Sequence, residues 1–290
     1  MTDIRNDQIQ FDIQRQSESI SDQAGRKMTV LFEERGQNIA DTHVCHLRQV
    51  HEISLSMDIL PFRYLRNQRA LSTIDQLKFC QACVAVVGAG GLGGYAADIL
   101  ARMGLGKLIL IDPDIFTESN LNRQRFALKE TLNQSKVDAA ANLLQSINPA
   151  VETLSIREKL TAENGERLLA GTAVAVDALD NIPDRLTLQT VCENIRIPLV
   201  HGAIAGFEGQ VATILPGQTG LKNLYEDGQS ASPAPEFLLG VPAITPMMIA
   251  GLQVMEVIKI LLNRGSLLSE TMAYLDLESG NLEKFRFGGQ

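Results

Sequence analysis

The glycine-rich run GAGGLGG at residues 88–94 is the stretch whose residue types most directly indicate chemistry. The apolar, β-branched run at 83–87 predicts a buried strand before it, and residues 95–103 continue with helical spacing. Glycines at GxGxxG spacing let the backbone turn tightly and approach a ligand closely, while the first amides of the helix bind phosphate oxygens. The stretch therefore predicts a nucleotide site between a strand and a helix. The glycines of this pattern are Gly88, Gly90 and Gly93.

Asp112 is a second candidate, because it directly follows a predicted strand at 107–111. It lies 24 residues after Gly88 (112 − 88 = 24). This is close to the spacing at which an acidic residue of a dinucleotide-binding fold binds ribose hydroxyls. An aspartate before Pro113 also suits a turn or a helix cap. Both roles remain open at this point.

The polar segment at 116–128, FTESNLNRQRFAL, carries Asn120, Arg123 and Arg125, and the next predicted helix begins at Lys136. Guanidinium and ammonium groups so close to a glycine loop suit a polyphosphate, whose charge they neutralise. The alternative is a basic patch on the surface. The nucleotide loop upstream favours the polyphosphate.

A third group of polar residues follows the predicted strand at 173–176. Asp177, Asp180 and Asn181 stand at its carboxyl end, where ligands of open α/β sheets collect. A carboxylate there can hold Mg²⁺ on a triphosphate. Asp180 or Asn181 can equally cap the helix predicted at 183–195, and one residue suffices for that role.

The elements that must position these residues alternate between strands and helices. This alternation predicts an α/β fold with a Rossmann-like open sheet, mostly parallel, with helices on both faces. Two strands at the C-terminal end, joined by a turn at Gly280 and Asn281, add an antiparallel part. The predicted strands are 83–87, 107–111, 151–156, 173–176, 197–200, 207–215 and the 271–286 hairpin, and the main helices are 95–103, 136–147, 163–169, 183–195 and 243–263.

The chain divides at about residue 58. Residues 1–58 are polar and show helical spacing at 20–32 and 39–55, so they are expected to form a helical N-terminal extension. Residues 59–290 are expected to form the ATP-binding domain. Within it, 216–237 is rich in Gly, Ser, Pro and Asp, which predicts a mobile loop.

Composition excludes several classes of protein. A net charge of −8 argues against general binding to nucleic acid or to anionic membranes. The first twenty residues lack the apolar core of a secretory signal. The apolar stretch 238–262 contains charged and proline residues and suits a buried helix better than a membrane span. The expected location is the cytoplasm.

Cysteine and histidine spacing offers little support for a metal site. Cys80 and Cys83 form a CxxC pair, but Cys83 opens a buried strand and no second pair exists to complete a zinc site. His43 and His46 can share a helix face, yet no further ligands lie at suitable spacing. No zinc is expected.

Taken together, the motifs resemble the ubiquitin-activating-enzyme-like adenylyltransferases of the HesA, MoeB and ThiF type. The resemblance covers about 60–288 and depends on several motifs in the right order. These are RYLRNQ at 63–68, GAGGLGG at 88–94, DPD at 112–114, SNLNRQ at 119–124, Lys136, and DN at 180–181 followed by Arg185.

The resemblance implies a role for each matching residue. Gly91 and its loop would lie against the ATP phosphates, Asp112 would bind the ribose, and Asp180 would bind Mg²⁺. Arg66 matches the arginine finger that reaches the ATP of the partner subunit across a two-fold dimer. Further residues expected at ATP are Ser119, Asn120, Arg123, Lys136 and Asn181. The expected catalytic residues are Arg66, Arg123, Lys136 and Asp180.

The implied reaction is an adenylation. The C-terminal Gly-Gly carboxylate of a small ubiquitin-like sulfur-carrier protein, of the molybdopterin or thiamine type, attacks the α-phosphorus of ATP and yields an acyl-adenylate and pyrophosphate. The nucleophile is already anionic, so no general base is required. The loop before the long C-terminal helix lacks the cysteine with which some relatives form a thioester or persulfide, and Cys192 is expected to pack in the core.

Three alternatives remain. The glycine loop and Asp112 alone would also permit an NAD-dependent oxidoreductase, although the cations at Arg123 and Lys136 count against it. A second is an adenylating enzyme of the same fold with another substrate, such as tRNA. A third is a non-catalytic scaffold, against which the retained Arg66, Arg123, Lys136 and Asp180 argue.

Overall fold

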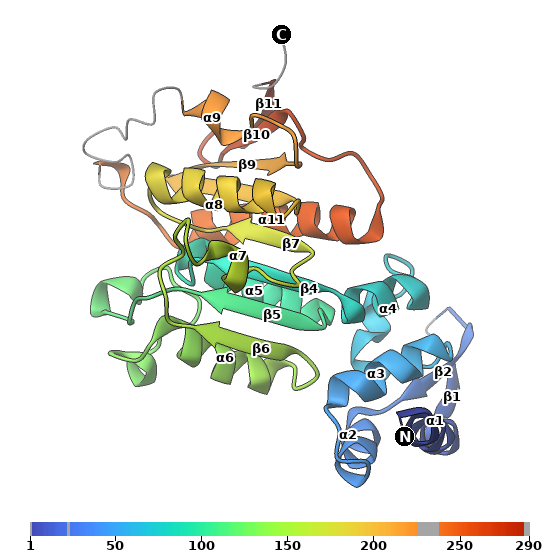
Figure 1. Ribbon diagram of the computed structural model, residues 1–290. Helices are drawn as coiled ribbons and strands as arrows, with labels where there is room; N and C mark the ends of the chain where they lie inside the picture. Colours follow the sequence, from blue (N-terminus) through green and yellow to red (C-terminus); the bar gives the residue numbers. More distant parts are fainter. Residues whose placement is uncertain (1, 22–23, 226–237, 287–290) are drawn as a thin grey trace.

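The computed structural model describes residues 2–21, 24–225 and 238–286, which form a large α/β unit and a smaller N-terminal unit (Figure 1). The large unit is built on an eight-stranded sheet of order β11-β10-β9-β8-β7-β4-β5-β6. The five strands from β6 to β8 run parallel, and β9, β10 and β11 extend the sheet antiparallel. The predicted fold class, with its C-terminal antiparallel part, is therefore confirmed. The strands are β4 (Cys83–Val87), β5 (Lys107–Ile111), β6 (Glu152–Ile156), β7 (Val174–Asp177), β8 (Leu199–Ala205), β9 (Glu208–Ile214), β10 (Thr271–Asp276) and β11 (Asn281–Arg286).

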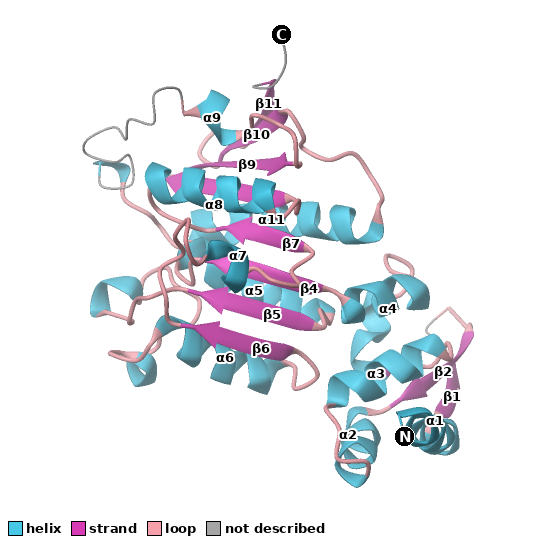
Figure 2. Cartoon of the chain, viewed as in Figure 1, coloured by secondary structure: helices cyan, strands magenta, loops and turns pink. Residues whose placement is uncertain are grey.

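Helices cover both faces of this sheet (Figure 2). Side chains of α4, α5, α6 and α11 form one apolar core with one face, and those of α7, α8 and α9 form a second core with the other. Each strand at the centre is buried on both sides, which explains its unbroken apolar sequence. The helices are α4 (Thr73–Gln81), α5 (Gly91–Met103), α6 (Lys136–Ile147), α7 (Gly165–Leu168), α8 (Ile182–Asn194), α9 (Leu221–Leu224) and α11 (Ile244–Leu262), with single 3₁₀ turns η2 (Glu118–Asn120) and η3 (Lys129–Thr131).

The order of the strands creates a switch point beside β4. From β4 the chain builds outward through β5 to β6, and it then returns to place β7 on the other side of β4. The loops that leave β4 and β7 therefore diverge at the carboxyl ends of the strands, which is where open α/β sheets bind ligands.

The N-terminal unit differs from its prediction. The helix expected at 20–32 is wrong, because β1 (Glu18–Ser21) and β2 (Lys27–Leu31) pair there as a hairpin. Val30 and Leu31 are buried in small apolar cores of this unit, and β2 pairs with β3 (Leu60–Pro61) from much later in the chain. Such pairing is decided by tertiary contacts that local spacing does not report. The unit is completed by α1 (Thr2–Gln16), α2 (Glu33–Thr42) and α3 (Leu47–Ser56).

The single helix expected at 39–55 is also replaced, since it is two helices, α2 and α3. Val44 lies between them with a positive φ of 51°, which breaks the helical path. His46 then caps α3, because its ring nitrogen accepts from the backbone amide of Arg48 at 3.1 Å.

A 3₁₀ segment, η1 (Phe62–Asn67), joins the two units and is fixed on both sides. Tyr64 is buried, and its hydroxyl lies 3.0 Å from the side-chain nitrogen of Asn148 in the large unit. Arg63 bonds to Glu33 of the N-terminal unit and to the carbonyl of Ile147. The segment that carries Arg66 is thereby held in place.

Three further predictions concern β8, the loop at 216–237 and α11. β8 is longer than the predicted 197–200 strand, so His201 lies inside the sheet instead of just beyond it. Of the loop expected at 216–237, residues 226–237 lie outside the described residues, and α9 forms before them. In the described ranges, α11 alone is long and apolar enough to span a membrane, and half of its apolar window is buried against the sheet.

Candidate active site

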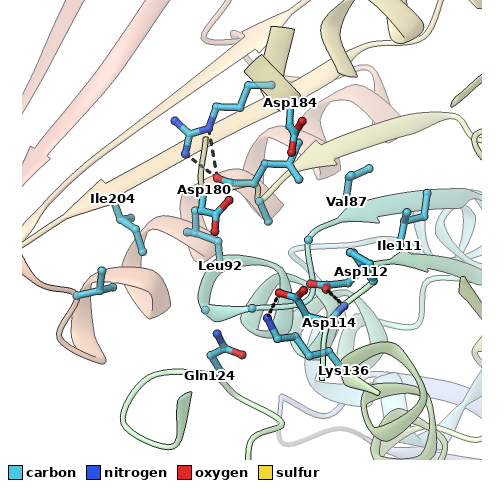
Figure 3. Close-up of a pocket in the computed structure, with 18 of the residues that line it drawn as sticks. Val87, Leu92, Ile111, Asp112, Asp114, Gln124, Lys136, Asp180, Asp184 and Ile204 are labelled. Carbon is cyan, nitrogen blue, oxygen red and sulfur yellow. Dashed lines mark hydrogen bonds and ion pairs between the residues drawn. The ribbon is translucent and has the colours of Figure 1, made fainter. Parts of the chain in front are cut away.

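A cleft of about 620 Å³ opens at the carboxyl ends of β4, β5 and β7, beside the switch point (Figure 3). The cleft is lined by residues of the glycine loop, of the basic segment at 116–128 and the stretches just before and after it, and of the loop after β7. Those relevant to the predictions are Gly88, Gly90, Gly91, Asp112, Arg123, Lys136 and Asp180. Gly93, Ser119, Asn120, Asn181 and Arg66 do not line it.

The glycine loop is tightly folded against its surroundings. Gly88 has a φ of +95°, and a Cβ there would lie 2.5 Å from the carbonyl oxygen of Ala178. A Cβ on Gly93 would lie 1.8 Å from the carbonyl oxygen of Gly88. Gly93 therefore shapes the loop from behind, even though it does not face the cleft.

The loop runs directly into α5, whose first turn meets the cleft at Gly91 and Leu92. The first intrahelical bond of this turn runs from the amide of Gly94 to the carbonyl of Gly90 at 3.0 Å. Amides before that point have no acceptor inside the helix, and the helix dipole favours an anion near them. This end of the cleft is suited to phosphate.

The carboxylate of Asp112 accepts hydrogen bonds from two backbone amides, one in the glycine loop and one after β5. Its Oδ2 accepts from the amide of Ala89 at 2.6 Å, and its Oδ1 accepts from the amide of Asp114 at 2.8 Å. The buried carboxylate thus ties the glycine loop to the end of β5. The turn role left open by the sequence is present, and the carboxylate also lines the cleft, so ribose binding stays a prediction.

The two predicted cations at the cleft have local partners. Lys136 is buried, and its Nζ lies 2.9 Å from Oδ2 of Asp114. The guanidinium of Arg123 donates to the carbonyl of Ser119 and to Oδ1 of Asn122, both at 2.9 Å. Figure 3 shows Lys136, Asp112 and Asp114 grouped at one end of the cleft. Arg125 points elsewhere, because it pairs with Asp98 on α5 at 3.1 Å.

Ser119 and Asn120 belong to the turn before the cleft. Oδ1 of Asn120 accepts from the amide of Thr117 at 3.0 Å, and the residue is buried. The hydroxyl of Ser119 lies 3.1 Å from that of Thr117. The side chain of Asn120 shapes the segment that presents Arg123, and its predicted contact with ATP remains untested.

Asp180 and Asn181 divide the two roles that the sequence left open. Oδ1 of Asn181 accepts from the amide of Asp184 at 2.9 Å and caps α8. Asp180 is exposed at the cleft, with Asn181 Nδ2 at 3.2 Å from its Oδ1. The carboxylate that faces the cleft is therefore that of Asp180.

Sequence reasoning missed several residues of the cleft. Gln124 is buried and lines it, and its Oε1 has no hydrogen-bond partner. A buried amide oxygen without a hydrogen-bond partner is a group that a water molecule or a ligand can satisfy. The sequence feature that could have identified Gln124 was its place directly after Arg123 in the SNLNRQ motif. Asp114, Asn122 and Arg185 belong to the motifs quoted above but were assigned no role, and they also line the cleft. The other missed side chains at the rim are Glu158, Lys159 and Asp184.

The remaining candidates for special chemistry lie apart. In the described ranges no three His, Cys, Asp or Glu side chains cluster as metal ligands would. Burial raises the pKa of the Cys80 and Cys192 thiols to about 12 each, so both are expected to be protonated packing residues. Arg66 lies on η1 and does not line the cleft of its own chain.

The cleft fits a magnesium nucleotide by its donor set. Backbone amides and a buried lysine converge where phosphates would lie, and Gln124, with its buried unpartnered oxygen, lines the same cleft. The exposed carboxylate of Asp180 also lines the cleft, and a carboxylate is a type of group that hard cations prefer as a ligand.

Comparison with known proteins agrees with this geometry. Residues 64–289 match the model of the ThiF family. The SAMP-activating enzyme E1 of Haloferax volcanii is 36% identical over 228 residues, which is 77% of this chain and 84% of that protein. The adenylyltransferase and sulfurtransferase MOCS3 of Culex quinquefasciatus is 33% identical over 79% of this chain, and the chain spans only 53% of it. The fold is similar to that of Escherichia coli MccB, crystallised with MccA-N7isoASN, with a TM-score of 0.68, 19% identity, and coverage of 79% of this chain and 72% of MccB.

Proposed function

The chain belongs to the ThiF family, and we propose on this basis that it adenylates the C-terminal Gly-Gly carboxylate of a small ubiquitin-like sulfur-carrier protein with MgATP. The related proteins named an activating enzyme and an adenylyltransferase support this activity. The observation that carries the proposal is the convergence of the glycine loop, Lys136 and Asp180 on one cleft at the switch point.

The chain's own groups account for the chemistry. The first amides of α5, with Lys136 and Arg123, would hold the triphosphate and stabilise the charge that spreads over it during the reaction. Bound Mg²⁺, held by Asp180, would neutralise further phosphate charge. Because the carrier carboxylate is already anionic, the protein only needs to position it in line with the α-phosphorus. Asp112 is proposed to bind the ribose once the nucleotide is present.

We also propose that the active unit is a two-fold homodimer in which Arg66 serves the partner's cleft. Arg66 does not line its own cleft, although η1 is fixed between the two units of the chain. An apolar stripe on one face of α11 supports the dimer: its residues are between 42% and 45% exposed and share helical spacing. The stripe consists of Ile244, Met247, Met248 and Met255. Pro246, on the same helix, lies next to the cleft, since a Cβ added to Gly91 would lie 3.2 Å from Cβ of Pro246.

The direct test is isotope exchange between pyrophosphate and ATP with a purified small protein that ends in Gly-Gly. We expect exchange that requires both Mg²⁺ and the free C-terminal carboxylate, and none with a carrier that lacks its last two glycines. Calorimetry should show MgATP binding and no NAD binding. Tight NAD binding without ATP binding would contradict the proposal.

The same proposal predicts that the protein binds no zinc and lies in the cytoplasm. Metal analysis of the purified protein should find no stoichiometric zinc, and one tightly bound zinc per chain would contradict this. Fractionation should place the protein in the cytoplasm, away from membranes.

A further inference from the structure

A network of buried polar side chains lies directly behind the candidate active site, and the proposed chemistry does not use it. Asp177 and His201 are fully buried partners on the adjacent strands β7 and β8. Oδ2 of Asp177 lies 2.7 Å from Nδ1 of His201. Burial is the largest influence on the pKa of His201 and lowers it, which favours the neutral ring.

The hydroxyl of Tyr225 completes a chain of hydrogen bonds. It accepts from Arg185 at 3.1 Å and from Nε2 of Gln210 at 3.0 Å, so its own proton is available for Nε2 of His201 at 3.4 Å. Nδ1 of His201 then donates to Asp177. The neutral tautomer with its proton on Nδ1 satisfies every group in this order.

The other ends of this network bind the two peptide groups on either side of Leu179, in the wall of the cleft. The amide of Leu179 donates to Oδ1 of Asp177 at 3.0 Å. The carbonyl of Leu179 accepts from Nε and Nη2 of Arg185 at 3.2 and 2.6 Å. The second of these peptide groups joins Leu179 to Asp180, so the position of Asp180 depends on it.

Burial makes the network sensitive to the loss of one member. Arg185 is only 6% exposed, and Asp177 is not exposed at all. A buried charge that loses a partner retains the cost of its desolvation, so the remaining groups are expected to rearrange.

We propose that Tyr225 and His201 are positioning residues, which hold Arg185 and Asp177 on the backbone of Leu179 and so set the place of Asp180. This inference rests on the proposed function for the role of Asp180 as a magnesium ligand. The hold on Leu179 itself is independent of any reaction.

The test uses Tyr225→Phe, which removes one hydroxyl, and His201→Asn, whose amide can still donate to Asp177 but does not reach Tyr225. Tyr274→Phe is the matched control, because Tyr274 bonds to Glu208 on the far antiparallel part of the sheet. Amide hydrogen exchange of the peptide covering 178–182 should be roughly threefold to tenfold faster in both test variants, as expected for one lost hydrogen bond, and unchanged in the control. The melting temperature of each variant shows whether that variant is globally unfolded.

A second readout connects the network to Asp180. The free Mg²⁺ concentration that gives half-maximal ATP binding in calorimetry should rise by a similar factor, roughly threefold to tenfold, in both test variants. ATP binding at saturating Mg²⁺ should recover to the wild-type value. A merely structural defect would lower binding at every Mg²⁺ concentration.

The possible outcomes distinguish failure of the positioning inference from failure of the proposed function. Unchanged hydrogen exchange at 178–182 in Tyr225→Phe overturns the inference, and so does faster exchange without a shift in Mg²⁺ dependence. Failure of the wild-type protein to bind MgATP overturns the proposed function and the role of Asp180 with it, while the exchange rates still decide whether Leu179 is held as described.

Discussion

At the scale of single residues, neighbouring polar side chains of similar chemistry have different contacts. Asn181 caps α8, and Asp180 faces the cleft. Arg123 lies at the cleft, whereas Arg125 pairs with Asp98. The backbone direction at each position decides which side chain is available to a ligand.

The first prediction concerns Asp180. Asp180→Ala should lower pyrophosphate exchange by about 100-fold or more, because the phosphate charge then loses its metal-binding carboxylate at the reaction step. The melting temperature should stay unchanged, since the side chain is exposed. Asp7→Ala removes another exposed aspartate, on α1, and should keep full activity. Wild-type exchange in Asp180→Ala would remove this residue from the mechanism.

A second prediction concerns His51, which is buried beside Tyr64 with an unpartnered Nδ1. Burial lowers the pKa of His51 from 6.5 to about 3. The unfolded chain therefore binds a proton below pH 6.5 that the folded chain does not, so stability falls as the pH drops from 6.5 toward about 3.

The test is to replace His51 with Phe, which keeps an aromatic ring against Tyr64 and does not titrate. Between pH 7.5 and 5.5, wild type should lose about 1.4 kcal/mol more unfolding free energy than His51→Phe, measured by urea denaturation. The lowered pKa of His201 acts in both proteins and cancels. Equal losses in the two proteins would show that His51 is already protonated or exposed in the folded state.

At the scale of elements, the turn between β4 and α5 has little tolerance for added side-chain atoms. Gly93 packs against the carbonyl of Gly88, and Gly88 against the carbonyl of Ala178 after β7. These contacts hold three elements of the cleft together. A side chain there meets backbone atoms, which cannot move aside as a flexible side chain can.

The third prediction follows from this geometry. Gly93→Ala should abolish ATP binding and lower the melting temperature, because its Cβ would lie 1.8 Å from the carbonyl oxygen of Gly88. Gly36→Ala on α2 is the matched control, since its Cβ would meet only leucine side chains, that of Leu47 at 3.3 Å and that of Leu31 at 3.6 Å. Calorimetry and thermal unfolding measure both effects. Normal ATP binding by Gly93→Ala would mean that the loop tolerates a different path.

At the scale of the whole molecule, the proposed dimer would join two incomplete sites. Each chain has a cleft, and each carries Arg66 on a segment that does not line that cleft. A closed two-fold arrangement would supply each site with a residue from the other chain.

The fourth prediction tests the α11 stripe as the dimer interface. Met248→Glu should convert the dimer to a monomer, because a charge would be buried among apolar side chains. Leu282→Glu on β11 is the control and should leave the dimer intact, since it replaces an exposed apolar residue outside the stripe, 53% exposed against 44% for Met248. Sedimentation velocity measures the outcome. A Met248→Glu dimer as stable as wild type would place the interface elsewhere.

The fifth prediction tests whether Arg66 acts across that interface. Arg66→Ala alone should lower pyrophosphate exchange by roughly a thousandfold, as the loss of an arginine finger does in phosphoryl transfer, with little loss of dimerisation. Mixing Arg66→Ala with Asp180→Ala should restore part of the activity, because a mixed dimer places both lesions in one site and leaves the other intact. Mixed dimers that are confirmed by mass and still inactive would show that Arg66 acts within its own chain or not at all.

Much of the large unit follows from local sequence. The strand, glycine turn and helix at 83–103 were predictable because a buried parallel strand is uniformly apolar and a tight turn at positive φ requires glycine. The helices α6, α8 and α11 and the C-terminal hairpin were predicted for similar local reasons. Family resemblance then pointed to the cleft residues Lys136 and Asp180, which local spacing alone left ambiguous.

Other features were decided only by tertiary contacts. Local spacing predicted a helix at 20–32, but β2 is a strand because it pairs with β3, which lies far along the chain. His201 is inside β8 and bonded to Asp177 because β7 and β8 are neighbours in the sheet. Gln124 lines the cleft and has a buried oxygen without a partner, and no periodicity reports the direction of a side chain in an irregular turn. Residue type and spacing describe what a segment can form by itself, whereas strand pairing, burial and the path of turns depend on segments that are distant in sequence.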